Sequence, residues 1–317
     1  MPNPFTLPLS QELSSSKNIL IAGIGGGFDI YAGLPLYFNL ISMQKTVHLA
    51  NYSFTQLQKT TATQIHPLCY HVTPHSQLPS SSNYFPEKYL CEWLTQQHLN
   101  PTVYAFAGSG PKRIAESYTT LCHKLNIDIL LLIDGGTDGL MFGDEEHLGT
   151  PLQDYTSLAA AHQIPNIKKY LACIGFGIDN ISHNCFLENI ATITKQGGFL
   201  GTHKLFANTN ESQLYQSAVE YANQKMSGHE SIINNAIIAS LNGHLGSEYI
   251  ASKTRAKNLS IHPLMSQYWF FQLESLIQNS CYYELIKDLN TQDEVIEALH
   301  MKLPLVKPMR KTKQVIL

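Results

Sequence analysis

Charged residues are scarce in this sequence: Asp, Glu, Lys and Arg make up only 14% of its 317 residues, against about a quarter in ordinary globular proteins. The formal net charge is −3, so the chain has no overall positive field and we expect no nucleic-acid partner. The N-terminus lacks a basic segment followed by an apolar run, unlike a secretory signal peptide. The longest mainly apolar stretch, residues 127–133, is too short to span a bilayer, so we expect no transmembrane segment.

Six cysteines are present, but none has the C-x-x-C spacing and none lies beside a suitable pair of histidines. A disulfide framework and a zinc site are therefore disfavoured. We expect buried, reduced cysteines and a reducing compartment, the cytoplasm. The sequence also lacks the G-x-S-x-G, Walker A and H-E-x-x-H motifs, which argues against serine hydrolases, P-loop enzymes and zinc proteases.

Apolar runs bounded by glycine alternate with helix-like segments through the first two thirds of the chain. Such alternation predicts an α/β fold with an open, mostly parallel, doubly wound sheet of the Rossmann-like kind. The clearest predicted strands are residues 18–23, 46–50, 102–107, 127–133 and 170–174. Further on the pattern becomes mostly helical, and helices are predicted for residues 212–226, 230–241, 263–278 and 292–300.

These patterns divide the chain into four parts. An N-terminal extension, residues 1–17, precedes a Rossmann-like nucleotide-binding core, residues 18–205. A mainly helical part, residues 206–301, is expected to pack on that core. The last part, residues 302–317, is a basic tail that we expect to be solvated, with contact to a membrane or a partner as the alternative. The oligomeric state is left open.

The first predicted strand is followed by a glycine-rich loop that ends in Asp29. Ligands of open α/β sheets bind beyond the carboxyl ends of the strands, and Gly25, Gly26 and Gly27 would let a phosphate approach the backbone there. The G-x-G-x-x-G pattern fails because Phe28 stands at its third glycine, and no acid ends the second strand. A standard NAD dehydrogenase is therefore disfavoured. A tight turn without a ligand is the alternative.

A second glycine loop follows the strand predicted at residues 102–107. It contains Gly108, Ser109 and Gly110, and Arg113 lies in the first turn of the following helix. Cations at a helix start oppose the helix dipole, which a phosphate or carboxylate nearby would relieve. Solvated surface cations explain the pattern equally well.

Acids and glycines crowd the loop after the strand predicted at residues 127–133. This loop contains Asp134, Gly135, Gly136, Thr137 and Asp138, and later Asp144. Carboxylates gathered at one rim repel one another unless a cation, a metal or a hydrogen-bonding substrate joins them. Such groups can activate water, bind Mg²⁺ or hold ribose hydroxyls. The alternative is that Asp134 and Asp138 only serve as turn and cap residues.

A fourth loop, residues 175–183, contains Asp179 and His183. The imidazole of His183 is a candidate acid–base group, because histidine titrates near neutral pH. A lone histidine at a helix start is more often structural, and that alternative stays open.

Several of these segments resemble the family called domain of unknown function 1152. The run Ile-Leu-Ile-Ala-Gly-Ile-Gly-Gly-Gly-Phe-Asp29 resembles its start, and residues 134–138, 143–145 and 149–154 resemble its central signature. The loop ending at Asp179 and residues 197–201 follow in the expected order. The resemblance covers about residues 18–270 and implies a Rossmann-like fold. It implies no reaction, because the family's activity is not established.

The asparagine- and glutamine-rich, arginine-poor composition is similar to that of effectors secreted by intracellular bacterial pathogens. In that setting the chain resembles ADP-ribosyl hydrolases, which remove a partner effector's modification. This resemblance implies an ADP-ribosylated protein as substrate, and export into a host cell without a signal peptide.

The leading hypothesis is a hydrolase that cleaves the N-glycosidic bond between an ADP-ribosyl group and a protein side chain. Carboxylates suit this chemistry because its transition state is oxocarbenium-like and positive. The predicted catalytic residues are Asp134, Asp138, Asp179 and His183. The predicted binding residues are Gly25, Gly26, Gly27, Asp29, Gly108, Ser109, Gly110, Arg113, Gly135, Gly136, Thr137 and Asp144. The cofactor is left open, with Mg²⁺ as the candidate. The alternatives are a non-catalytic nucleotide- or NAD-binding module and a nucleotide-dependent transferase or lyase.

Overall fold

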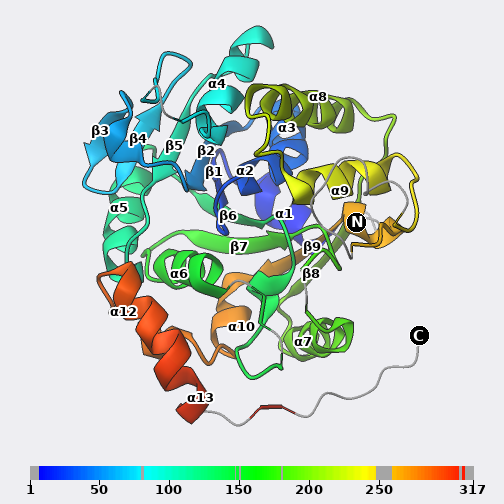
Figure 1. Cartoon of the computed structure of the whole chain (residues 1–317). Coiled ribbons are helices and arrows are strands. Elements are labelled where there is room, and N and C mark those ends of the chain that lie inside the picture. Colours follow the sequence, from blue (N-terminus) through cyan, green and yellow to red (C-terminus); the bar gives the residue numbers. More distant parts are fainter. Residues whose placement is uncertain are drawn as a thin grey trace.

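The computed structural model of the chain describes residues 7–79, 82–146, 148–149, 151–179, 181–247, 259–306 and 309–310. These residues form one nine-stranded sheet in the order β3-β4-β5-β2-β1-β6-β7-β9-β8, with helices on both faces (Figure 1). The strands are β1 (Asn18–Gly23), β2 (Thr46–Tyr52), β3 (Thr63–His66), β4 (Cys69–Val72), β5 (Val103–Phe106), β6 (Ile129–Asp134), β7 (Lys168–Cys173), β8 (Phe199–Lys204) and β9 (Gln267–Gln272).

The centre of the sheet is parallel, from β5 through β2, β1 and β6 to β7. The predicted Rossmann-like α/β fold is therefore confirmed. The inner strands β1 and β6 are almost wholly buried, which explains their unbroken apolar sequences: helices cover both faces of a parallel sheet. The edges are antiparallel, with a β3–β4 hairpin beside β5 on one side and β9 between β7 and β8 on the other.

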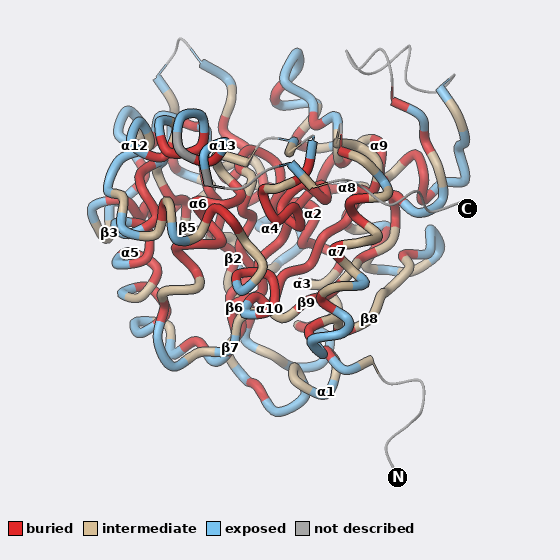
Figure 2. The backbone as a smooth tube through the Cα atoms, turned by 90° about the horizontal axis from the view of Figure 1, so that it is seen from below, coloured by how far each residue is buried: buried red, intermediate tan, exposed pale blue. Residues whose placement is uncertain are grey.

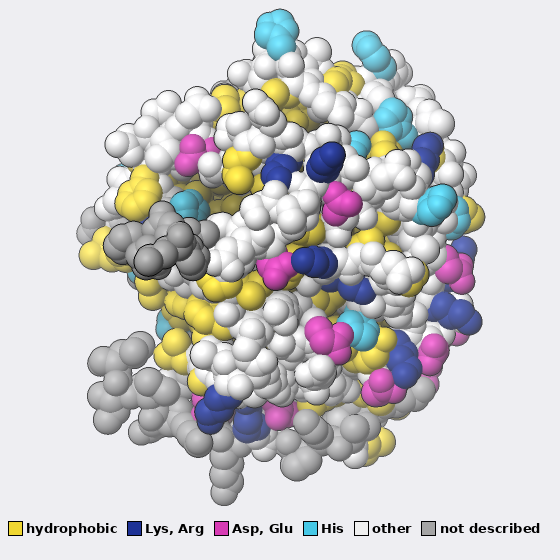
Figure 3. Space-filling view, turned by 180° about the vertical axis from the view of Figure 1, so that it is seen from behind, with side chains coloured by type: hydrophobic (Ala, Val, Ile, Leu, Met, Phe, Trp, Pro, Cys, Tyr) yellow, Lys and Arg dark blue, Asp and Glu magenta, His cyan; other side chains and the backbone are white. Residues whose placement is uncertain are grey.

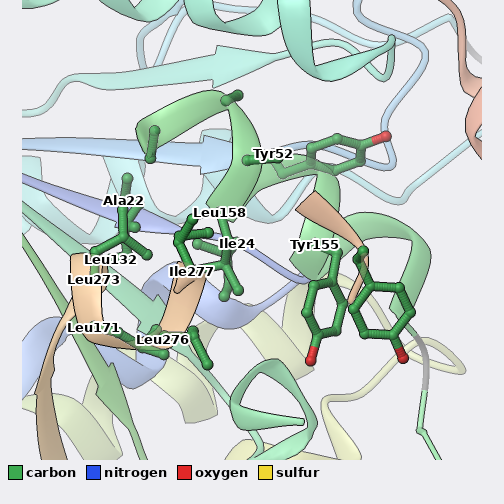
Figure 4. Packing of buried hydrophobic residues seen from close by; sticks show 14 of the residues in the cluster. Ala22, Ile24, Tyr52, Leu132, Tyr155, Leu158, Leu171, Leu273, Leu276 and Ile277 are labelled. Carbon is green, nitrogen blue, oxygen red and sulfur yellow. The ribbon is translucent and has the colours of Figure 1, made fainter. Parts of the chain in front are cut away.

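Alternate side chains of β1 enter two separate cores, because successive residues of a strand point to opposite faces. Ile19 and Ile21 join the core shared with α1 (Pro8–Ser14), α3 (Leu34–Ser42), α4 (Pro86–Gln96), α8 (Asn210–Lys225) and α9 (Ile232–Leu241). Leu20 and Ala22 join the core shared with α5 (Pro111–Lys124), α6 (Pro151–His162), α7 (His183–Lys195), α10 (Leu273–Ile277), α11 (Tyr283–Ile286) and α12 (Gln292–Glu297). Figure 4 shows part of this second core, where Ala22, Leu132 and Leu158 pack together.

Burial concentrates in the strands and the inner sides of the helices, while exposed residues lie on the outer turns (Figure 2). On the face shown in Figure 3, acidic and basic side chains are scattered among uncharged surface without a large patch of one sign. All six cysteines are buried. None of the helices in the described part of the chain has the length and apolar character needed to cross a membrane.

The helix predicted for residues 263–278 is wrong. This segment contains a short 3₁₀ turn, η3 (Pro263–Ser266), then β9, then α10. The β9 sequence Gln-Tyr-Trp-Phe-Phe-Gln is rich in aromatic residues, which favour strands, and it pairs with β7 on one side and β8 on the other. The predicted helical part thus supplies one strand to the sheet of the core. The division of the chain at residue 205 stays a prediction.

Candidate functional site

Three buried aspartates meet at the edge of the sheet where β1 and β6 end. Asp134 is the last residue of β6, Asp29 begins α2 (Asp29–Ala32) after the loop that follows β1, and Asp154 lies in the first turn of α6. One carboxylate oxygen from each lies within 4.8 Å of the other two. We call these residues the aspartate triad. The parallel pairing of β1 with β6 places their carboxyl ends side by side, where open α/β sheets bind ligands.

Glycines let the backbone approach these carboxylates closely. A Cβ atom on Gly25 would lie 2.6 Å from Asp154 Oδ1 and 2.7 Å from Asp29 Oδ2, and one on Gly139 would lie 2.8 Å from Asp134 Oδ2. These separations are too short for real contacts. The same backbone solvates the acids, because the N–H of Gly25 donates to Asp29 Oδ2 at 2.6 Å and that of Gly139 to Asp134 Oδ2 at 3.0 Å. Glycine at these two positions therefore leaves room for the carboxylates, and its backbone N–H forms hydrogen bonds with them.

The two glycines after β6, Gly135 and Gly136, also leave room for a carboxylate each. A Cβ atom on Gly135 would lie 2.8 Å from Asp29 Oδ1, and one on Gly136 would lie 2.4 Å from Asp179 Oδ2. The N–H of Thr137 donates to Asp179 Oδ2 at 2.6 Å. This contact brings the loop after β7 against the loop after β6, so the structure joins two of the predicted site loops.

Asp138 lies beside the triad and begins the 3₁₀ turn η2 (Asp138–Leu140). It is buried, and a Cβ atom on Gly149 would lie 2.3 Å from Asp138 Oδ2. Its negative charge raises the pKa values of all three triad members and of Asp179. The sequence-predicted acids Asp29, Asp134, Asp138 and Asp179 therefore form one electrostatic cluster with Asp154.

Burial is the main cause of the raised pKa values in this cluster, because it disfavours the charged form of a carboxyl group. It raises the pKa of Asp29 to about 7 and that of Asp179 to about 8. It raises the pKa values of Asp134 and Asp154 well above their ordinary range, and repulsion from Asp138 adds to this effect. Backbone N–H groups lower the pKa of Asp29 in part.

Within the part of the chain that the structure describes, no cation pairs with the aspartate triad. Among the described residues, no Lys, Arg or His forms an ion pair with the triad or with Asp179. The Oδ1 atom of Asp154 and the Oγ1 atom of Thr137 are buried and have no hydrogen-bond partner among the described residues. Buried acceptors without a partner are rare in native proteins because they lose their hydration without compensation. A divalent cation fits this donor set, since Mg²⁺, Mn²⁺ and Ca²⁺ prefer carboxylate oxygens.

Aromatic side chains lie against the remaining glycines of the first loop. Gly26 and Gly27 have positive φ angles of 93° and 61°, which favour glycine. A Cβ atom on Gly26 would lie 2.6 Å from the ring of Phe54, and one on Gly27 would lie 2.7 Å from the hydroxyl of Tyr84. Two aromatic residues therefore border this loop, next to the carboxylates around Gly25.

The second glycine loop packs against a distant segment of the chain. Ser109 Oγ donates to the carbonyl of Asn290 at 2.9 Å, and the N–H of Gly110 donates to the same carbonyl at 3.0 Å. A Cβ atom on Gly110 would lie only 2.3 Å from the Leu289 carbonyl oxygen. Gly108 borders the hydroxyl of Tyr52. The loop follows β5, two strands away from β1, so the structure does not bring it to the triad.

Three other predicted site residues lie apart from the triad. Arg113 is exposed on α5. His183 is exposed at the start of α7, with its ring centroid 6.3 Å from that of His262. Asp144 lies 3.5 Å from Arg310 Nε through its Oδ1 atom.

Two buried acids of this region were missed as site residues in the sequence. Asp154 lies in residues 149–154, a segment that resembles the family signature. Nothing in the sequence spacing shows that helix α6 turns its side chain toward β1. Glu145 is fully buried and accepts hydrogen bonds from the N–H groups of Phe142 and Gly143, and also from Arg310. Its acid-rich neighbourhood was the only signal available in the sequence.

The solved structures that resemble this chain do so weakly. Teicoplanin deacetylase in its zinc-inhibited form is 12% identical, with a TM-score of 0.33, and the match covers 81% of this chain and 98% of that chain. A complex of that deacetylase with teicoplanin is 10% identical, with a TM-score of 0.30 and the same coverage. Similarities this low carry no argument about function. No curated protein matches the chain.

The family comparison is stronger. The model described as "Protein of unknown function (DUF1152)" matches residues 52–303, well over half of the chain. The matched residues include the loops after β6 and β7, but not the loop after β1. The family resemblance expected from the sequence is thus confirmed, and the chain belongs to the DUF1152 family of proteins of unknown function.

Proposed function

We propose that the chain is a divalent-cation-dependent hydrolase that cleaves the N-glycosidic bond between an ADP-ribosyl group and a protein side chain. The observation that carries this proposal is the aspartate triad, in which one buried oxygen atom of Asp154 has no hydrogen-bond partner in the described part of the chain. Three buried carboxylates within 4.8 Å of one another repel strongly unless a cation joins them. Mg²⁺ is the first candidate, because it takes few protein carboxylates and leaves room for substrate oxygens.

Asp29, Asp134 and Asp154 would hold the cation. A divalent cation supplies positive charge that orients and acidifies the hydroxyl groups of water or substrate. Asp179 lies just outside the triad, anchored by the N–H of Thr137. Burial raises the pKa of Asp179 to about 8 in the metal-free protein, so we assign this carboxyl the role of donating a proton to the nitrogen of the leaving group.

The negative charge of the cluster also suits the sugar of this substrate. Cleavage of a glycosidic bond passes through an oxocarbenium-like state, in which positive charge develops on the ring. Asp138 lies beside the triad and would supply negative charge next to that ring. Placement of the diphosphate along Gly25 to Gly27 stays a prediction. Its second predicted seat, Gly108 to Gly110, is weakened because that loop packs against residues 289 and 290.

The test is release of ADP-ribose from a mono-ADP-ribosylated protein, with Mg²⁺ or Mn²⁺ and with EDTA. We expect release by the wild-type chain with a cation, none with EDTA, and a loss of about 10²- to 10⁴-fold in Asp134→Asn. Asp288→Asn, an exposed acid, is the control and should keep full activity.

Three outcomes would contradict this proposal in different ways. Full activity of Asp134→Asn would show that the triad takes no part in the reaction. Full activity with EDTA would show that the reaction needs no cation. Binding of the cation and of ADP-ribose without release would favour the alternative, a non-catalytic nucleotide-binding module.

A further inference from the structure

We propose that the buried pair Asn51 and Glu87 positions Asp29 for the divalent cation by holding the glycine loop after β1. Asn51 lies near the end of β2, opposite Gly23 of β1, and Glu87 lies in the first turn of α4. Both residues are 0% exposed, so they act through the loop and are positioning residues. This inference rests on the cation site of the proposed function, but not on its reaction.

The glycine loop cannot fix its own shape. Gly25, Gly26 and Gly27 follow one another, and glycine adopts many backbone conformations. The loop nevertheless holds Asp29, because the N–H of Gly25 donates to Asp29 Oδ2 at 2.6 Å and the N–H of Asp29 donates to the carbonyl of Gly26 at 3.3 Å. The position of the Asp29 carboxylate therefore depends on contacts that fix the loop from outside.

One buried amide group makes such a contact. Asn51 Nδ2 donates to the carbonyl of Gly27 at 2.9 Å and to Glu87 Oε1 at 2.8 Å. Burial raises the pKa of Glu87 to about 6, so at pH 7.5 its ionised carboxylate accepts hydrogen bonds and donates none. The NH₂ end of the amide must therefore face both acceptors. Glu87 thus determines which end of the Asn51 side chain turns toward Gly27.

This arrangement explains why an amide stands near the end of β2. Dinucleotide-binding folds carry an acid near this point, which holds the ribose. An aspartate at position 51 would turn its oxygens toward the Gly27 carbonyl and the Glu87 carboxylate, which both need a donor. Gly23 leaves room for the amide, because a Cβ atom there would lie 2.3 Å from Asn51 Oδ1. Position 51 therefore serves the backbone of the loop.

Stability alone does not explain the pair. Asn51 Oδ1 and Glu87 Oε2 are buried and have no hydrogen-bond partner among the described residues. Buried polar atoms without a partner destabilise the folded state, and burial of a carboxylate adds to this cost. Apolar side chains of the same shape would fill this space at a lower cost, but they could not hold the Gly27 carbonyl.

The experiment is calorimetric titration of Mn²⁺ into the full chain at pH 7.5. Glu87→Met keeps the length of the side chain but removes the acceptor oxygen, and we expect Mn²⁺ to bind about 10-fold more weakly, the lower end of the cost of losing a contact behind a metal ligand. Glu87→Gln keeps an acceptor oxygen for Asn51 and should bind Mn²⁺ with wild-type affinity. Glu116→Ala, which removes an exposed acid on α5, is the control and should change nothing.

A double-variant cycle tests whether the two residues act through one another. Asn51→Leu keeps the shape of the side chain and removes both hydrogen bonds, so we expect a loss of about 10- to 100-fold in Mn²⁺ affinity. Adding Glu87→Met to Asn51→Leu should cause no further loss, because Glu87 acts only through the amide. Thermal unfolding of each variant checks that it is folded. If Asn51→Leu does not fold, the comparison of Glu87→Met with Glu87→Gln decides.

Three results would overturn the inference and leave the proposed function intact. They are wild-type affinity in Glu87→Met, equal losses in Glu87→Met and Glu87→Gln, and additive losses in the double variant. A wild-type chain that binds no Mn²⁺ would overturn both this inference and the cation of the proposed function. The titration contains no ADP-ribosylated protein. If the chain binds Mn²⁺ as expected but releases no ADP-ribose, the role of Asn51 and Glu87 stands and the hydrolase proposal falls.

Discussion

Replacing Asp154 with asparagine should stabilise the metal-free protein, although it alters a buried polar residue. Asp154 is buried, and no described residue forms a hydrogen bond with its Oδ1 atom. Its pKa is raised well above the ordinary value by burial and by the neighbouring aspartates. Asparagine has nearly the same shape as aspartate but no charge. The substitution therefore removes repulsion without opening a cavity.

The neighbouring Asp29 gives the scale of this effect. Burial raises its pKa from 3.8 to about 7, and a tenfold change in acidity corresponds to about 1.4 kcal/mol. Keeping such a carboxylate ionised at pH 8 thus costs on the order of 4 kcal/mol of folding free energy. The new amide at position 154 also needs partners, so we expect a net gain of about 2 kcal/mol. For a chain of 317 residues, the melting temperature would rise by about 3 °C.

The assay is thermal unfolding in EDTA at pH 5 and pH 8, followed by titration with Mg²⁺ or Mn²⁺. Asp154→Asn should be more stable than the wild type at pH 8, with a smaller gain at pH 5, where the folded wild type keeps its proton. Added cation should stabilise the wild type but not the variant. Asp288→Asn is the exposed control and should change neither response. A variant less stable than the wild type at pH 8 in EDTA would refute the reasoning.

Three further predictions concern pH and two contacts outside the triad. The folded metal-free chain holds protons that the unfolded chain releases, because the pKa of Asp29 rises from 3.8 to about 7. Its free energy of unfolding should therefore fall as pH rises from about 4 to about 7. Urea titrations at several pH values would measure it, and a rise in this free energy over the same pH range would contradict the prediction. Arg310→Ala removes a 2.9 Å hydrogen bond to the fully buried Glu145. We expect the free energy of unfolding to fall by about 1–3 kcal/mol and amide exchange in residues 141–146 to become faster. Unchanged exchange would argue against this contact. Gly110→Ala would place its Cβ 2.3 Å from the Leu289 carbonyl oxygen. We expect the free energy of unfolding, followed by heating, to fall by about 1–3 kcal/mol. An unchanged melting temperature would show that this packing is absent.

Local sequence determined most of the central sheet. The apolar runs of β1 and β6 could be recognised because strands covered on both faces carry apolar residues at every position. The alternation with helices predicted parallel order, and parallel order places the carboxyl ends of these strands at one edge. The amino-acid sequence alone was therefore enough to assign Asp134 and the acids near it to the rim of the sheet.

Only the tertiary structure determined which of those residues meet. Asp154 joins Asp29 because α6 packs at the end of β1, where Ser157 Oγ donates to the carbonyl of Ile24 at 2.8 Å. The loop Gly108 to Gly110 is closed by residues about 180 positions further along the chain. These contacts join distant segments, so neither periodicity nor motif spacing contains them. The sequence determined where acids and glycines stand along each element. The packing of those elements determined which carboxylates share one buried site.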